Sequence, residues 1–112
     1  MAGAMFVPTR SAPPVLGVRA LALEADSEFE VAARIKEGLP SSAVHALARQ
    51  LDRPSKYVLE VAGIPESTFH SHQKTRKPLS ADASSRVYQV ARVVEAAEEY
   101  FGGDKDAARR WL

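Results

Sequence analysis

The 112-residue sequence contains no cysteine. It therefore has no disulfide, no thiolate metal site and no cysteine nucleophile, and nothing in it indicates secretion. Long apolar runs are also missing. Arg10 and Arg19 interrupt the only candidates for an apolar targeting core, and no window is long enough to cross a bilayer. We therefore expect a cytoplasmic protein with no membrane partner.

The usual motifs of catalysis are missing as well. The sequence has no glycine-rich phosphate-binding loop, no nucleophile elbow, and no spaced pair of acids flanked by apolar residues. Glu95, Glu98 and Glu99 are most simply interpreted as the solvent-facing side of a helix. We therefore expect no enzymatic activity, no small-molecule substrate and no cofactor.

Histidine spacing argues against a metal site. His70 and His72 suggest one, with His45 as a possible third ligand. Residues two apart on a helix point about 200° away from each other, however, whereas helical ligand pairs are three or four residues apart. We expect an exposed His70, a structural or backbone-contacting His72, and no bound metal.

The composition that is present indicates a small folded protein. A hydrophobic fraction of 46% with 26% charged residues is typical of soluble globular proteins, and the length suits one domain with an arm. The net charge of +1 hides an uneven distribution, because residues 40–80 hold six bases against three acids and residues 24–39 hold five acids against two bases. A basic middle suits a polyanionic partner that meets one face of the protein.

The chain divides into an arm and a helical domain. Residues 1–23 show no sustained period and contain Pro8, Pro13 and Pro14. Order is expected from Ser27, where Glu30 three positions later completes a capping box. We therefore expect a flexible arm over residues 1–26 and one domain over residues 27–112.

The first half of this domain predicts three helices. The capping box begins a helix that ends near Glu37, before Gly38, with Phe29, Ala32 and Ile35 along one face. Ser41 or Ser42 caps a second helix, whose apolar stripe is Val44, Leu47, Ala48 and Leu51. A third helix runs from about Pro54 to Ala62 and buries Val58, Val61 and Ala62.

The second half of the domain predicts three more helices. A short helix follows Pro65, reaches about Gln73 and buries Phe69. Ser80 caps the longest helix, over about residues 81–101. Its inward residues are Ala83, Val87, Val90, Val94, Ala97 and Phe101, and its outward ones are Arg86, Arg92, Glu95 and Glu99. Gly102 and Gly103 end it, and Asp104 caps a final helix that presents Trp111 and Leu112. The prediction is an all-α bundle of five to six helices.

A helix-turn-helix is the strongest functional pattern. Residues 55–74 place two short helices around Gly63, the arrangement in which a second helix lies in the major groove of DNA. The outward side of that second helix carries groups that hydrogen-bond to bases or phosphates, namely Ser67, Thr68, His70, Ser71 and Gln73. Lys74, Arg76 and Lys77 follow it, and Arg53 and Lys56 precede the first helix; we expect these bases to contact phosphates.

Three features leave alternatives open. Two helices and a glycine turn also occur in helical proteins that never bind DNA, so a protein-binding adaptor is the competing hypothesis. Arg86 either contacts the DNA backbone or pairs with Asp82, and the ion pair is favoured. Trp111 and Leu112 either pack on the long helix or, together with Tyr100, form a partner or dimer interface.

Short segments spread over residues 27–112 form a recognisable series. They are Ser-Glu-Phe-Glu at 27–30, Lys-Glu-Gly-Leu-Pro at 36–40, Val-Ala-Gly-Ile-Pro at 61–65, Ser-Thr-Phe at 67–69, Leu-Ser at 79–80, Ser-Ser-Arg at 84–86, Ala97, Phe-Gly at 101–102, and Ala-Ala-Arg-Arg-Trp-Leu at 107–112. This series resembles the Xre/MbcA/ParS antitoxins. The most specific parts are the Gly-Ile-Pro turn and the closing Ala-Ala-Arg-Arg-Trp-Leu.

The resemblance implies a type II antitoxin that dimerises, represses its own operon and neutralises a RES-domain toxin, which consumes NAD or transfers ADP-ribose. It also implies that this chain is chiefly the DNA-binding half, or a truncated product, since the toxin-binding half follows the Arg-Trp-Leu stretch. The sequence departs from the family at residues 70–73, His-Ser-His-Gln, where relatives carry arginines. Leu59 also stands where a small residue is common.

Overall fold

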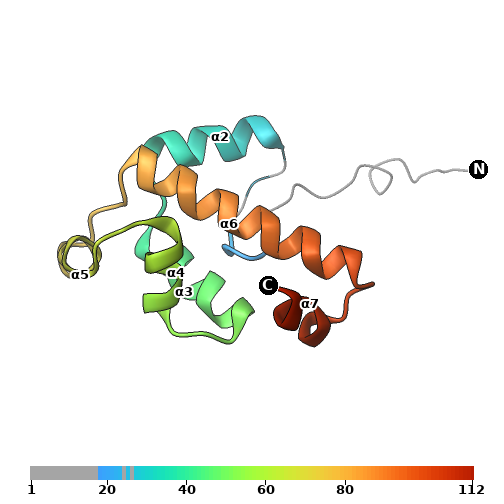
Figure 1. Ribbon diagram of the computed structural model, residues 1–112. Helices are drawn as coiled ribbons and strands as arrows, with labels where there is room; N and C mark the ends of the chain where they lie inside the picture. The colour runs from blue at the N-terminus through green and yellow to red at the C-terminus, as the bar shows by residue number, and fades with distance from the viewer. Residues whose placement is uncertain (1–17, 24, 26) are drawn as a thin grey trace, which may run out of the picture.

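The computed structural model describes residues 18–23, 25 and 27–112 (Figure 1). This part of the chain is all-α, as the sequence predicts. Its helices are α2 (Glu28–Glu37), α3 (Ser41–Leu51), α4 (Ser55–Ala62), α5 (Glu66–Thr75), α6 (Ala81–Tyr100) and α7 (Lys105–Trp111). The long helix α6 is central and contacts α2, α3, α4 and α7, while α5 lies at one end of the bundle (Figure 1).

Most helix ends follow the predicted caps. The side chains of Ser27, Ser80 and Asp104 each accept a hydrogen bond from the backbone N–H three residues later, at 3.2, 3.1 and 3.0 Å. The predicted serine cap of α3 is wrong. Pro40 occupies the N-cap with extended backbone, so Ser41 and Ser42 become the first residues of the helix itself.

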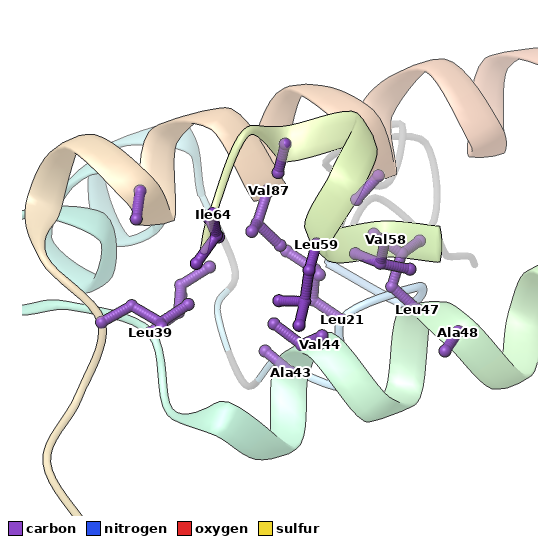
Figure 2. Close-up of a cluster of buried hydrophobic side chains, with 14 of the residues drawn as sticks. Leu21, Leu39, Ala43, Val44, Leu47, Ala48, Val58, Leu59, Ile64 and Val87 are labelled. Carbon is purple, nitrogen blue, oxygen red and sulfur yellow. The ribbon is translucent and has the colours of Figure 1, made fainter. Parts of the chain in front are cut away.

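The core lies where α3, α4 and α6 meet. Figure 2 shows Val44 and Leu47 of α3 against Val58 and Leu59 of α4, with Val87 of α6 beside them. These five side chains are at most 2% exposed. Burial of this apolar surface is the main source of stability, and it places α4, the first helix of the expected motif, firmly on the bundle. The structure therefore accommodates the large Leu59 side chain inside the core.

Two apolar predictions are wrong because the side chains concerned lie on helix faces that the neighbouring helices leave exposed. Helix α2 contacts chiefly α6, so it buries Val31, whereas Phe29 is 84% exposed and Ala32 is also exposed. Val61, near the end of α4, is 53% exposed. A periodic pattern identifies an apolar face but cannot say how much of that face a neighbour covers.

The described part of the N-terminal segment is packed on the domain. Ala20 and Leu21 are buried, and Leu21 reaches the core beside Val44 (Figure 2). The backbone N–H of Ala20 donates to Glu95 Oε2 at 2.8 Å. The prediction of a flexible arm is therefore wrong for residues 18–23. For residues 1–17, 24 and 26, that prediction lies outside the described residues.

Glu95 and Glu98 are buried, which corrects their expected position on a solvated face. Arg19 pairs with both, at 3.9 Å from Glu95 and 3.4 Å from Glu98, and the Gln50 amide also donates to Glu98. A buried carboxylate is tolerated when charged and polar donors surround it. These donors come from the N-terminal segment and from α3, more than 40 residues away in the sequence.

A backbone clasp joins the α2–α3 and α5–α6 connections. Gly38 ends α2 at φ 101°, and the next residue, Leu39, donates from its N–H to Ser84 Oγ at 2.8 Å. The Leu39 carbonyl accepts from the N–H of Leu79 at 2.9 Å. The clasp fixes the loop that follows α5. In the part of the chain that the structure describes, no helix combines the length and apolar character needed to cross a membrane.

Candidate nucleic-acid interface

Helices α4 and α5 form the expected pair of helices around a glycine turn. Gly63 adopts the left-handed conformation, φ 70° and ψ 35°, which glycine reaches without steric cost. The N–H of Ile64 then donates to the Leu59 carbonyl at 2.8 Å, and the Ile64 side chain is buried. Pro65 sets the entry to α5. The turn predicted from the sequence is confirmed.

One aromatic side chain anchors α5. Phe69 is the one buried residue of this helix, and its ring meets the ring of His45 on α3 edge to face, with centroids 5.6 Å apart. Nδ1 of His45 lies 2.8 Å from Ser55 Oγ at the start of α4. His45 therefore joins both helices of the motif to α3, which is a structural role that the sequence analysis did not predict.

The rest of α5 faces outward. The side chains expected to read bases or phosphates are all exposed, namely Ser67, Thr68, His70, Ser71, Gln73 and Lys74. In Figure 1 the helix lies at the end of the bundle with no described segment beyond it. The outer side of α5 is therefore polar and open, as is the outer side of the second helix of a helix-turn-helix.

The basic loop after α5 turns back toward α3. Arg76 is left-handed at φ 59° and caps α5, while the N–H of Lys77 donates to the His72 carbonyl at 2.8 Å. A cleft lies where this loop meets the start of α3, and both hydroxyl and cationic side chains line it. It is lined by Gly38, Pro40, Ser41, Ser42, Gln73, Arg76, Lys77 and Pro78. Ser41 and Ser42 were missed as site residues, because the capping pattern was the only signal they carried.

The remaining predicted contacts lie apart from this cleft. Arg53 and Lys56 are exposed near the start of α4, the opposite end of that helix from Gly63. The Arg53 guanidinium stacks on the Tyr57 ring, 5.4 Å from its centroid. The structure thus separates the bases into the loop after α5 and a second pair beside α4.

The histidines of α5 occupy different environments. His70 is exposed and His72 is half-buried, with its Nδ1 shielded from solvent and without a hydrogen-bond partner. This confirms the expected exposure of His70, and it shows His72 partly covered by the protein. Among the described residues, no three histidines or carboxylates come together as a metal site.

Arg86 supports the turn from α6. Its Nε donates to the Ala62 carbonyl, the last of α4, at 2.6 Å, and its Nη1 pairs with Asp82. The favoured ion pair is confirmed. The bond to Ala62 adds a contact with the C-terminal end of α4, where carbonyl groups lack helical partners.

Arg86→Ala should lower the free energy of unfolding by about 1–2 kcal/mol, because it leaves the Ala62 carbonyl without its charged donor. Asp82→Ala is the matched control, since it removes the exposed ion pair and keeps the bond to Ala62; we expect a change of about 0.5 kcal/mol or less. Chemical denaturation measures both. Equal losses for the two variants would contradict a role for Arg86 at the turn.

A second exposed surface lies around the end of α6 and on α7. Tyr100 is 82% exposed, Trp111 65% and Leu112 42%. The Trp111 ring lies 6.5 Å from Phe101, so it packs against α6 on one side only. Arg109 fixes α7 by donating to the Gln50 carbonyl of α3 at 3.0 and 3.2 Å.

The comparisons with known proteins agree with this geometry. The model of the antitoxin Xre-like helix-turn-helix domain matches residues 30–92, which include all of α3, α4 and α5. The chain belongs to this antitoxin family. This match confirms the family that the Gly-Ile-Pro turn indicates.

Two curated proteins are similar in sequence to this chain. The chain is 30% identical over 78 residues to the Antitoxin Xre of Photorhabdus laumondii subsp. laumondii, and the match covers 70% of this chain and 53% of that protein. It is 27% identical over 78 residues to the Antitoxin Xre of Yersinia enterocolitica, with the same coverage. The chain spans about half the length of these curated relatives. No solved structure matches it.

Proposed function

We propose that this chain is a DNA-binding autorepressor that inserts α5 into the major groove of its own operator. The observation that carries the proposal is the exposed polar surface of α5, held out from the bundle by the buried Phe69. The Antitoxin Xre relatives support an antitoxin role. We place the protein in the cytoplasm. In this proposal the toxin is the enzyme of the pair, and the antitoxin has no catalytic activity of its own.

Each part of the surface has a distinct role. Four side chains of α5 contact base edges, namely Ser67, His70, Ser71 and Gln73. Thr68 lies beside them. The cations contact phosphates. Lys74 lies in the last turn of α5, and Arg76 and Lys77 follow that helix; Arg53 precedes α4, and Lys56 lies in its first turn. Because hydroxyl, imidazole and amide groups replace the arginines of relatives, we expect the sequence preference to differ from theirs.

A homodimer fits the proposed repression. Two copies place two α5 helices in successive major grooves when the half-sites are about 10 bp apart on one side of the duplex. A footprint over the upstream region would show this spacing directly.

The partner protein proposed for this antitoxin is a RES-domain toxin that consumes NAD or transfers ADP-ribose. The exposed Trp111 and Leu112 support a protein-binding role for the end of α7. A helical adaptor that binds protein but no DNA is the second candidate function, and the same two side chains favour it.

Salt-dependent binding to the operon's own upstream DNA tests the proposal. In fluorescence polarisation, we expect affinity to fall linearly with salt concentration on logarithmic axes, because bound cations release counterions from phosphates. A shuffled duplex of the same length is the control and should bind at least about 1,000-fold more weakly. No salt-dependent binding to the upstream DNA would favour the adaptor.

A further inference from the structure

The C-terminal half of α6 carries an uncovered stripe with coiled-coil spacing. Gln89, Val93, Ala96 and Tyr100 are separated by four, three and four residues, and all four are exposed. This is the spacing of the two inward positions of a heptad. Within the part of the chain that the structure describes, no helix covers this stripe.

The stripe is also hollowed and apolar at its centre. A shallow groove is lined by Val93, Ala96, Ala97, Tyr100, Phe101 and Trp111. It continues along α6 past Arg92 to Gln89. The small Ala96 side chain lets a second helix approach closely, while Tyr100 and Trp111 form one wall. An exposed apolar helix face of this kind is typical of an interface.

The charges beside the stripe select the occupant and its direction. Arg92 and Glu99 are seven residues apart, and each immediately precedes an inward position, Val93 and Tyr100. Arg92 is held on this side by the Tyr88 ring, 5.9 Å from its centroid. Burial raises the pKa of the Tyr88 hydroxyl above its ordinary value, and the charge of Arg92 opposes that shift.

Building on the homodimer proposed above, we propose that the stripe is its contact surface, and that it binds the same stripe of a second copy with the two α6 helices antiparallel. In this arrangement, Arg92 of each copy faces Glu99 of the other, so two opposite-charge pairs flank the apolar centre. Tyr100 of each copy then lies near Gln89 of the other, which places two hydrogen-bonding groups together. A parallel pair would instead set Tyr100 against Tyr100 and would leave Arg92 and Glu99 unpaired.

Dimerisation of the purified full chain without DNA tests this surface, so failure of the DNA-binding proposal would not affect the result. Val93→Glu places a charge at the centre and should raise the dimer dissociation constant at least about 100-fold in sedimentation equilibrium. Val61→Glu is the matched control, because Val61 is also a helical valine that is 53% exposed but lies on α4. It should leave the constant unchanged.

Charge reversal tests the direction. Arg92→Glu and Glu99→Arg should each weaken the dimer by about tenfold, because each creates two like-charge pairs in the symmetric complex. Combined in one chain, the two reversals should restore the original constant. Circular dichroism should show unchanged helicity for all variants.

Three results would overturn the proposal. The first is a chain that stays monomeric at every concentration. The second is equal weakening by Val93→Glu and Val61→Glu, which would show that the stripe is not the contact surface. The third is an additive loss in the double reversal, which would exclude the antiparallel pairing and indicate another occupant of the groove.

Discussion

Gly38→Ala should destabilise the domain strongly, and by more than Arg86→Ala does. A Cβ atom on Gly38 would lie 2.2 Å from the Leu79 carbonyl oxygen, which is backbone and cannot rotate away. The backbone at φ 101° is also one that side chains rarely adopt. We expect a loss of more than about 3 kcal/mol, which lowers the melting temperature by more than about 10 °C.

The matched control for this prediction is Gly102→Ala. Gly102 also has positive φ, 64°, but an added Cβ would meet nothing within 4 Å. Its cost is therefore only that of the left-handed conformation, about 1–2 kcal/mol. Thermal melts of the two variants separate the clash from the backbone strain. Similar melting temperatures would contradict the clasp between Leu39 and Leu79.

Replacing Lys74, Arg76 and Lys77 together by alanine should have the largest effect on DNA binding. Each lost phosphate contact removes about 0.9 from the slope of log affinity against log salt, so we expect the slope to fall by about 2–3. Affinity should drop similarly for the operator and for unrelated duplexes, because phosphates carry no sequence information. Titrations over a salt series measure both quantities.

Two double variants that remove the same positive charge test whether the position of the charge matters, rather than the net charge of the protein. Arg76→Ala with Lys77→Ala empties one side of the cleft beside α3. Lys105→Ala with Arg110→Ala removes the same charge from exposed positions on α7. The first pair should reduce the salt slope by about 2 and the second should leave it nearly unchanged. Equal slopes would place the DNA elsewhere.

The local part of the fold could be predicted from the sequence. Capping residues and glycines act within one helical turn, so Ser27, Gly38, Gly63 and Ser80 mark helix ends where the structure has them. The exposure of α5 could also be predicted locally. Phe69 is its single large apolar residue, so the other sides of the helix are polar.

Long-range contacts could not be predicted in the same way. The periodic pattern placed Glu95 outward, but its partner is the N–H of Ala20, 75 positions away. Ser41 and Ser42 line the cleft because the loop after α5 packs beside the start of α3. Both of these contacts join segments whose pairing leaves no mark in a short window of sequence. Val61 was expected inside but is 53% exposed, because a sequence pattern does not show how much of a helix face is covered.

The position of α7 has a consequence for the two binding surfaces proposed for this chain. Arg109 anchors this helix to the end of α3, and α3 and α4 lie between α7 and α5 (Figure 1). A second copy docked on the groove that Trp111 lines would leave the exposed side of α5 uncovered, so a dimer contact and a DNA duplex fit on one protomer at the same time. Dimer contact and DNA binding would then strengthen each other through avidity. One protomer bound to DNA would hold the second close by and so raise its effective concentration at the duplex.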